Sequence, residues 1–172
     1  MTTTEILTGE RADLLESLRQ HRWFLTFTAQ GLTDEQAASS PTASALCIGG
    51  LIKHVATVEE SWVRFIEHGT SAMEVDHEST DYENHAANFR MAPGETLEGV
   101  LARYQEVAAY TDRLVETVDL DLTHALPTAP WFPEGATRSA RRVLVHIVAE
   151  TAQHAGHADI IRETIDGQKT MG

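Results

Sequence analysis

The chain has 172 residues, of which 42% are hydrophobic and 23% are charged, a composition typical of a globular protein with one sizeable core. The 26 acidic residues outnumber the 13 lysines and arginines, which gives a formal net charge of -13. This excess argues against nucleic-acid binding, which requires a basic surface, and against docking on an anionic membrane.

The first part of the chain predicts one long helix and one short helix. The residues before them lack a basic region followed by an apolar run, so we expect no signal peptide. Apolar periodicity predicts the long helix over residues 8–30, with Thr8 as its N-cap and Gly31 as its stop signal. The segment Thr33–Gln36 matches a capping box and predicts a short helix before Pro41. The apolar positions of the long helix are Leu14, Leu15, Leu18, Trp23 and Leu25.

A second long helix is predicted over residues 46–68 and ends before Gly69. Cys47 is the only cysteine, so an intrachain disulfide is excluded, and we expect its thiol to be a small core group. A single cysteine fits a reducing cytoplasm, and no apolar stretch approaches membrane-spanning length, so we expect a cytoplasmic protein. One face of this helix carries Leu51, His54, Val58, Trp62 and Phe65.

Two further helices are predicted in the second half of the chain. The third covers residues 95–118, after the punctuation of Pro93 and Gly94. The fourth covers residues 138–166 and has Gly167 as a natural C-cap. The inner face of the third helix carries Leu97, Leu101, Tyr104, Val107 and Leu114. The inner face of the fourth carries Val143, Ile147, Thr151, His154, Ala158, Ile161 and Ile165.

Four amphipathic helices predict an all-α fold, a four-helix bundle that forms a single domain over residues 1–172. No segment shows the alternation that is typical of strands. Two connections are long, over residues 70–92 and 119–137, and long loops in compact domains are usually functional or disordered. A long crossover is needed where neighbouring helices run parallel, so the topology need not be a simple up-and-down one.

The most informative residues are His54, Glu150 and His154. Glu150 and His154 are four residues apart, so they lie on one face of the fourth helix and can converge on one ion. His54 lies on the apolar face of the second helix, and facing helices in a bundle core commonly hold metals. Three protein ligands and one open position are typical of a catalytic metal site. The competing interpretation is a set of core histidines bonded to backbone carbonyls or carboxylates.

Two more histidines lie on the same side of the fourth helix. His146, Glu150, His154 and His157 follow one another at steps of four, four and three residues. This face is wider than one ion, so we expect at most two of the four to bind it, with the others supporting the ligands or exposed to solvent. The histidines at helix ends and in polar loops are expected to be solvated; they are His21, His68, His77, His85 and His124.

The segments 146–167, 48–59 and 31–36 resemble the matching parts of the DinB-like superfamily, in its actinobacterial branch, and the likeness covers nearly the whole chain. The resemblance implies a four-helix bundle with a long crossover and one divalent metal, zinc or nickel. The metal would be held by a histidine of the second helix and two ligands of the last. Many members have two histidines in the last helix; here Glu150 replaces the first, as in relatives resembling mycothiol-dependent maleylpyruvate isomerase, and His154 matches the second.

The resemblance also implies a chemistry, the transfer or addition of a low-molecular-weight thiol such as mycothiol to an electrophilic small molecule through a metal-bound thiolate. A divalent ion stabilises a thiolate at neutral pH, so no cysteine of the protein is needed. The alternatives are a metal-dependent hydrolase, with His157 or Glu59 as general base, and a non-catalytic metal- or ligand-binding stress protein. A bundle of this kind is compatible with a homodimer.

Three arginines at the start of the fourth helix are open to two interpretations. Arg138, Arg141 and Arg142 could pair with an acidic ligand, or they could form a solvated helix end.

Overall fold

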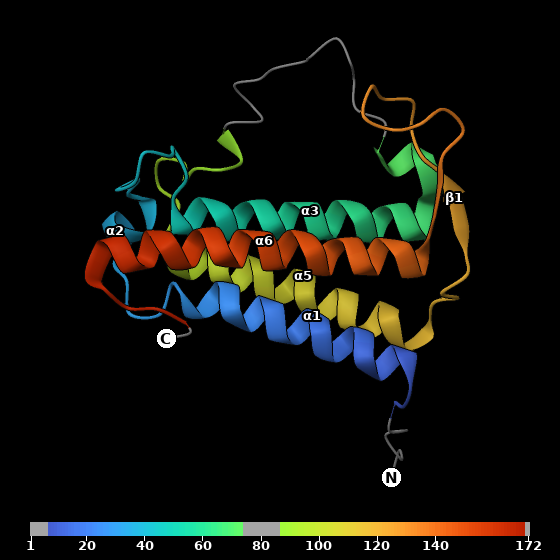
Figure 1. Ribbon diagram of the computed structural model, residues 1–172, viewed down its shortest axis with the longest axis horizontal. Helices are drawn as coiled ribbons and strands as arrows, with labels where there is room; N and C mark the ends of the chain where they lie inside the picture. Colours follow the sequence, from blue (N-terminus) through green and yellow to red (C-terminus); the bar gives the residue numbers. More distant parts are fainter. Residues whose placement is uncertain (1–6, 74–86, 171–172) are drawn as a thin grey trace.

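The computed structural model describes residues 7–73 and 87–170. Within these ranges four long helices form a bundle (Figure 1), namely α1 (Glu10–Phe27), α3 (Ile48–His68), α5 (Leu97–Thr117) and α6 (Ala140–Asp166). The shorter elements are α2 (Asp34–Ala38), the 3-10 helix η1 (Gly69–Met73) and the strands β1 (Thr123–Ala125) and β2 (Thr137–Ser139). The prediction of an all-α four-helix bundle is confirmed.

The ends of the helices follow local signals, with one correction. The capping box before α2 is present, because Thr33 Oγ accepts a hydrogen bond from Gln36 N (3.2 Å) and Gln36 Oε1 accepts one from Thr33 N (3.0 Å). Gly167 ends α6 in the left-handed conformation (φ 80°), as predicted. The prediction of Thr8 as the N-cap of α1 is wrong. The chain turns at Gly9, whose φ is 64°, so Thr8 lies one residue outside the cap position.

Contacts between the helices show which neighbours run parallel. Glu60 pairs with Arg103, and two turns further along both helices Glu67 accepts a hydrogen bond from Tyr110, so α3 and α5 run in the same direction. The helices α1 and α6 are also parallel, since their first turns are joined by an Arg141–Glu10 ion pair and Arg162 near the end of α6 reaches the end of α1. This parallel pairing of α3 and α5 is the topology for which a long crossover was predicted.

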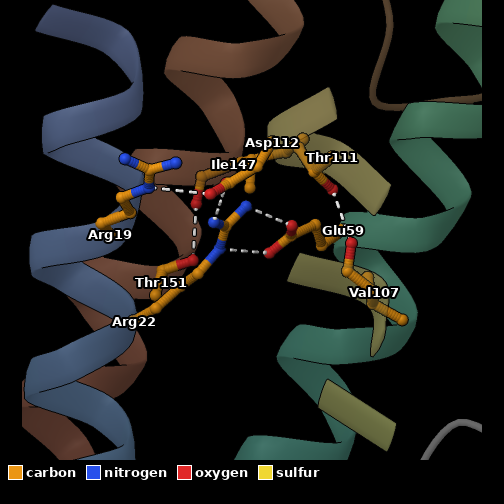
Figure 2. Close-up of polar contacts among 8 residues, drawn as sticks. All are labelled: Arg19, Arg22, Glu59, Val107, Thr111, Asp112, Ile147 and Thr151. Atoms are coloured by element: carbon orange, nitrogen blue, oxygen red, sulfur yellow. Dashed lines mark hydrogen bonds and ion pairs between the residues drawn. The ribbon is translucent and has the colours of Figure 1, made fainter. Parts of the chain in front are cut away.

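A buried ion cluster joins three of the helices at the centre of the bundle (Figure 2). The carboxylate of Glu59 on α3 is fully buried and accepts two hydrogen bonds from Arg22 on α1, at 3.2 and 2.5 Å. The same guanidinium binds Asp112 on α5 at 2.6 Å. Burial lowers the pKa of Arg22, but the two carboxylates outweigh it and raise the pKa overall. Because each charge is paired, the cluster fixes α1, α3 and α5 relative to one another.

The connection before α6 contains a small antiparallel hairpin that was not predicted. Strands β1 and β2 pair with His124 opposite Arg138. Each strand has three residues without apolar alternation, so no periodicity could show it. The prediction that His124 is solvated is wrong. Its Nε2 lies 3.0 Å from the carbonyl oxygen of Ile66, and its ring lies 5.7 Å from that of Phe65. The hairpin therefore packs on the end of α3.

Two further expectations concern Trp23 and Cys47. The expected apolar face of α1 is buried except for Trp23, which is 52% exposed. Its neighbour Arg22 faces the core instead, while Trp23 packs on Phe27 at the surface. Cys47 is buried as expected, and it also caps α3, because its Sγ accepts a hydrogen bond from Gly50 N at 3.4 Å. Its thiol is thus held in a structural position.

Candidate metal centre

His54, Glu150 and His154 converge between α3 and α6. Each offers one ligand atom, and these atoms all lie within 4.8 Å of one another. The two helices run antiparallel, and the rings of His54 and His154 meet edge to face with their centres 4.9 Å apart. His154 is buried, whereas His54 and Glu150 are partly exposed. The spacing of four residues on α6 and the apolar faces of both helices thus bring the three predicted side chains together.

The geometry of the pair on α6 fits a shared cation better than a hydrogen bond. His154 Nε2 lies 3.7 Å from Glu150 Oε2, which is too long for a hydrogen bond. A tetrahedral zinc ion with bonds of about 2.0–2.1 Å separates its ligand atoms by about 3.4 Å, close to this distance. The donor set of two imidazoles and one carboxylate also suits a divalent first-row metal. The three residues therefore fit a divalent ion, which with three protein ligands would keep one position of a tetrahedral shell for a further ligand.

His157 lies behind His154, on the side away from Glu150. The two Nδ1 atoms are 3.4 Å apart, so His154 presents its Nε2 to Glu150 and its Nδ1 to His157. Burial lowers the pKa of His154 below its ordinary value, and His157 lowers it further. The imidazole of His154 is therefore neutral at pH 7, which is the form that binds metals, and His157 is placed to orient it.

His146 faces the other oxygen of Glu150. Its Nε2 lies 3.7 Å from Glu150 Oε1, and its ring meets that of Trp62 edge to face at 5.0 Å. Burial lowers the pKa of His146, and the charge of Arg138 lowers it further. His146 is outside the group of three convergent ligand atoms. Glu150 thus lies between two imidazoles, only one of which shares a centre with His54.

Phe89 covers the ring of His54, a contact that was not predicted. The two rings stack with their centres 3.9 Å apart and their planes 25° apart. This contact depends on Gly49 and Gly50, since a Cβ at Gly50 would lie 1.9 Å from the carbonyl oxygen of Phe89, and one at Gly49 would lie 2.3 Å from Met91 Sδ. The Gly-Gly pair at the start of α3 was the one signal that another segment approaches closely there.

Among the described residues, the other histidines, Glu59 and the three arginines do not belong to the ligand cluster. Glu59 is enclosed in the core ion pair with Arg22, so it is not available as a general base near the cluster. His68 is exposed as predicted, whereas His21 is partly buried and contacts the ring of Phe24. His77 and His85 are outside the described residues. Of the three arginines, Arg141 pairs with Glu10 and Asp121, Arg142 is exposed, and Arg138 lies half-buried near His146.

In this bundle the neighbouring helices α3 and α5 run parallel, and three residues that could bind a metal converge between α3 and α6. This arrangement is typical of the DinB-like class. The chain belongs to the mycothiol S-transferase family of that class, because the family model matches residues 13–167.

A likeness to a solved structure supports the fold but not a function. This structure is that of a conserved protein of Enterococcus faecalis. It has 16% sequence identity and a TM-score of 0.69, over 94% of this chain and 100% of that one. A comparison with curated proteins found no match. Within the described residues, no helix is both long and apolar enough to cross a membrane.

Proposed function

We propose that this protein is a metal-dependent thiol transferase that joins a low-molecular-weight, mycothiol-like thiol to an electrophilic small molecule. His54, Glu150 and His154 would hold one divalent ion, zinc or nickel. The single observation that carries the proposal is the convergence of these three ligand atoms within 4.8 Å, in a chain of the mycothiol S-transferase family. A bound divalent ion would supply a positive charge that favours the thiolate form of the thiol.

Side chains around the three ligands would orient them and keep water away from the ion. His157 orients the neutral imidazole of His154 through their facing Nδ1 atoms. The ring of Phe89 shields one face of His54 from solvent. In the overall reaction the thiol loses its proton to solvent and its sulfur forms a bond to the electrophilic carbon. In a substitution, the leaving group departs with the electron pair of the broken bond; in an addition, the π electrons of the double bond pass to the neighbouring atom, which takes up a proton. The nucleophilic sulfur belongs to the small thiol, because Cys47 is buried and caps α3.

The competing functions have less support. A hydrolase would need a general base beside the ion, and Glu59 is committed to Arg22 in the core. His157 is the remaining candidate base, but its Nδ1 faces the ring nitrogen of His154. A non-catalytic metal-binding protein has the same ligand cluster, so an activity measurement separates it from the transferase.

The test joins metal analysis with a thiol assay. Protein purified without added ions is analysed for bound metals, and the loss of free thiol in the presence of an electrophile is followed with and without chelator. We expect about one equivalent of zinc or nickel, and thiol loss that stops on chelation and returns with the metal. Cleavage of esters or amides without thiol would indicate the hydrolase. A metal-replete protein that consumes no thiol would indicate the non-catalytic alternative.

Variants identify the ligands. His54→Ala and His154→Ala should each remove most of the bound metal, whereas His68→Ala, which changes an exposed histidine of α3, should leave the metal content unchanged. A His154→Ala protein that keeps a full equivalent of tightly bound metal would contradict the ligand assignment.

The remaining expectations stay part of this proposal. We propose a single domain over residues 1–172, located in the cytoplasm, with a small thiol and a small electrophile as partners rather than nucleic acid or a membrane. The acidic net charge of -13 supports the exclusion of nucleic acid. A homodimer is compatible with a bundle of this kind, and sedimentation analysis of the purified protein would decide its oligomeric state.

A further inference from the structure

Arg138 on β2 is held between two aromatic rings. Its guanidinium carbon lies 4.7 Å from the centre of the Trp62 ring and 5.5 Å from that of Phe132. Residues opposite each other in a strand pair point to the same face, and His124, the partner of Arg138, contacts Phe65 on α3. The hairpin therefore places Arg138 against α3. Stacking between rings fixes the plane of the guanidinium without using its hydrogen-bond donors.

The guanidinium of Arg138 has a buried nitrogen without a hydrogen-bond partner among the described residues. Nη1 of Arg138 is buried and makes no hydrogen bond within the described part of the chain. Other arginines there are paired with acids, including Arg19, Arg22, Arg103, Arg141 and Arg162. Burial and the charge of Arg142 lower the pKa of Arg138, as expected for a cation without a nearby anion. A buried unpaired donor is costly, so an acceptor that binds it would gain free energy.

Arg138 is linked to the metal centre by a short series of contacts. Trp62 carries Arg138 on its ring and touches His146 at 5.0 Å between ring centres. His146 Nε2 lies 3.7 Å from Oε1 of Glu150, a member of the ligand cluster. These contacts, and the effect of the Arg138 charge on the pKa of His146, place Arg138 beside the same stretch of α6 as the cluster, with the side chains of Trp62 and His146 between them. Arg142, in the first turn of α6, is exposed to solvent.

We propose that Arg138 binds a carboxylate group of the substrate that reacts at the metal centre. A planar guanidinium with free donors matches a carboxylate, which it binds with two parallel hydrogen bonds. The inference rests on the proposed function only in naming the anion as part of a substrate; the anion-binding property of Arg138 is tested without metal. It narrows the substrate class to molecules that carry a carboxylate in addition to the reacting atom.

The binding test uses Trp62 as the reporter, because its ring lies under the guanidinium. Trp23→Phe and Trp131→Phe, at positions that are 52% and 74% exposed, leave Trp62 as the single tryptophan. Metal-free protein is titrated with benzoate and, separately, with uncharged benzamide at about pH 8, where neutral imidazoles provide no positive charge. We expect a saturable fluorescence change with benzoate and none with benzamide. Equal responses to both, or no saturable response to benzoate, would overturn the proposal.

Matched variants in this background test whether the charge must be at position 138. Arg138→Met should weaken benzoate binding by about tenfold or more, because it removes the N–H donors that would bind the carboxylate. The methionine side chain can still pack between the two rings. Arg142→Met makes the same change in net charge at an exposed site and should alter binding by less than about twofold. Equal weakening by both variants would show a diffuse effect of charge and would contradict a site at Arg138. Circular dichroism and thermal unfolding confirm that each variant is folded.

The same titration distinguishes the two sources of the carboxylate. It is repeated on the metal-loaded protein with N-acetylcysteine and with N-acetylcysteinamide, its uncharged counterpart. A preference for the acid that is lost in Arg138→Met would place the carboxylate on the thiol. No such preference, with benzoate binding retained, would place it on the electrophile. Because benzoate binding is measured without metal, a failure of the metal centre and a failure of the Arg138 site give different results.

Discussion

Oε2 of Glu150 lies 3.7 Å from Nε2 of His154, one helical turn further along α6. The separation is too long for a hydrogen bond and close to that of two ligands on one ion. His154 is buried while Glu150 is partly exposed, and a ligand atom of His54 on α3 lies within 4.8 Å of theirs. An ion placed between the three groups would give each of them a partner. The four-residue spacing of Glu150 and His154 on α6 therefore forms one half of a site, and His54 on α3 forms the other half.

The first prediction concerns the replacement of the carboxylate by an imidazole. Glu150→His creates two histidines four residues apart on α6, and its ring nitrogen can reach the same centre as Glu150. We expect the variant to keep zinc within about tenfold of the original affinity, while Glu150→Ala loses about 100-fold or more. Competition with a zinc-binding dye measures both values. Equal loss in the two variants would show that Glu150 contributes to the site in another way.

The second prediction concerns the glycine that admits Phe89. Gly50→Ala places a Cβ 1.9 Å from the carbonyl oxygen of Phe89, so residues 87–91 must move away from α3. We expect a loss of about 1–3 kcal/mol in the free energy of unfolding and weaker metal binding, because the stack on His54 is broken.

The control for this change is Gly156→Ala on α6. Apart from its own helix backbone and its chain neighbours, no atom lies within 4 Å of the added Cβ, so this variant should gain about 0.5–1 kcal/mol from helix propensity. Urea unfolding of the metal-free proteins measures both changes. A Gly50→Ala protein as stable as the original would mean that residues 87–91 do not pack on α3 as described.

The third prediction concerns the buried ion cluster. Arg22→Met leaves the fully buried carboxylate of Glu59 without its partner, and we expect a loss of about 3–5 kcal/mol in the free energy of unfolding. The double variant Arg22→Met, Glu59→Met removes both charges and should recover a large part of this loss. Urea unfolding checks the series. If the double variant were no more stable than Arg22→Met, the pair in Figure 2 would not be the source of the effect.

The fourth prediction concerns the stability of the metal-free protein against pH. Folding lowers the pKa of His146 and His154 below the ordinary value of 6.5, mainly by burial. Between the folded pKa values and 6.5, the unfolded chain therefore binds more protons than the native protein. Stability should be full above pH 6.5 and should fall as the pH drops through that window.

Thermal unfolding across this pH range measures the effect. His154→Leu removes one of the two titrating groups, so its stability should fall less steeply with acid than that of the original protein. A metal-free protein whose melting temperature rose on acidification through this range would contradict the burial of both rings.

Periodicity predicted the parts of the site that lie on regular helices. His54 on the apolar face of α3 and the pair on α6 were found because positions three and four residues apart share a helical face. The same reasoning failed for Trp23. The neighbouring residue Arg22 faces the core instead, because it forms a buried ion pair with Glu59. Patterns of polarity do not show where a charge is paired in the core.

The contacts that complete the site come from irregular segments and could not be predicted. Phe89 reaches His54 through a close approach of two backbones, and only the glycines at the start of α3 hinted at it. Arg138 differs from Arg141 and Arg142 through its place on a strand of three residues, which is too short to leave a periodic signal. Such contacts depend on tertiary packing rather than on local sequence.

The most direct test of the central claim is the coordination of the bound metal. X-ray absorption spectra of the zinc- or nickel-loaded protein should show two imidazoles and one carboxylate from the protein, and His54→Ala should remove one imidazole from the spectrum. A thiol added to the original protein should appear as a metal–sulfur bond of about 2.3 Å. A spectrum with no imidazole that depends on His54, or a metal bound equally well without Glu150 and His154, would contradict a shared centre between α3 and α6.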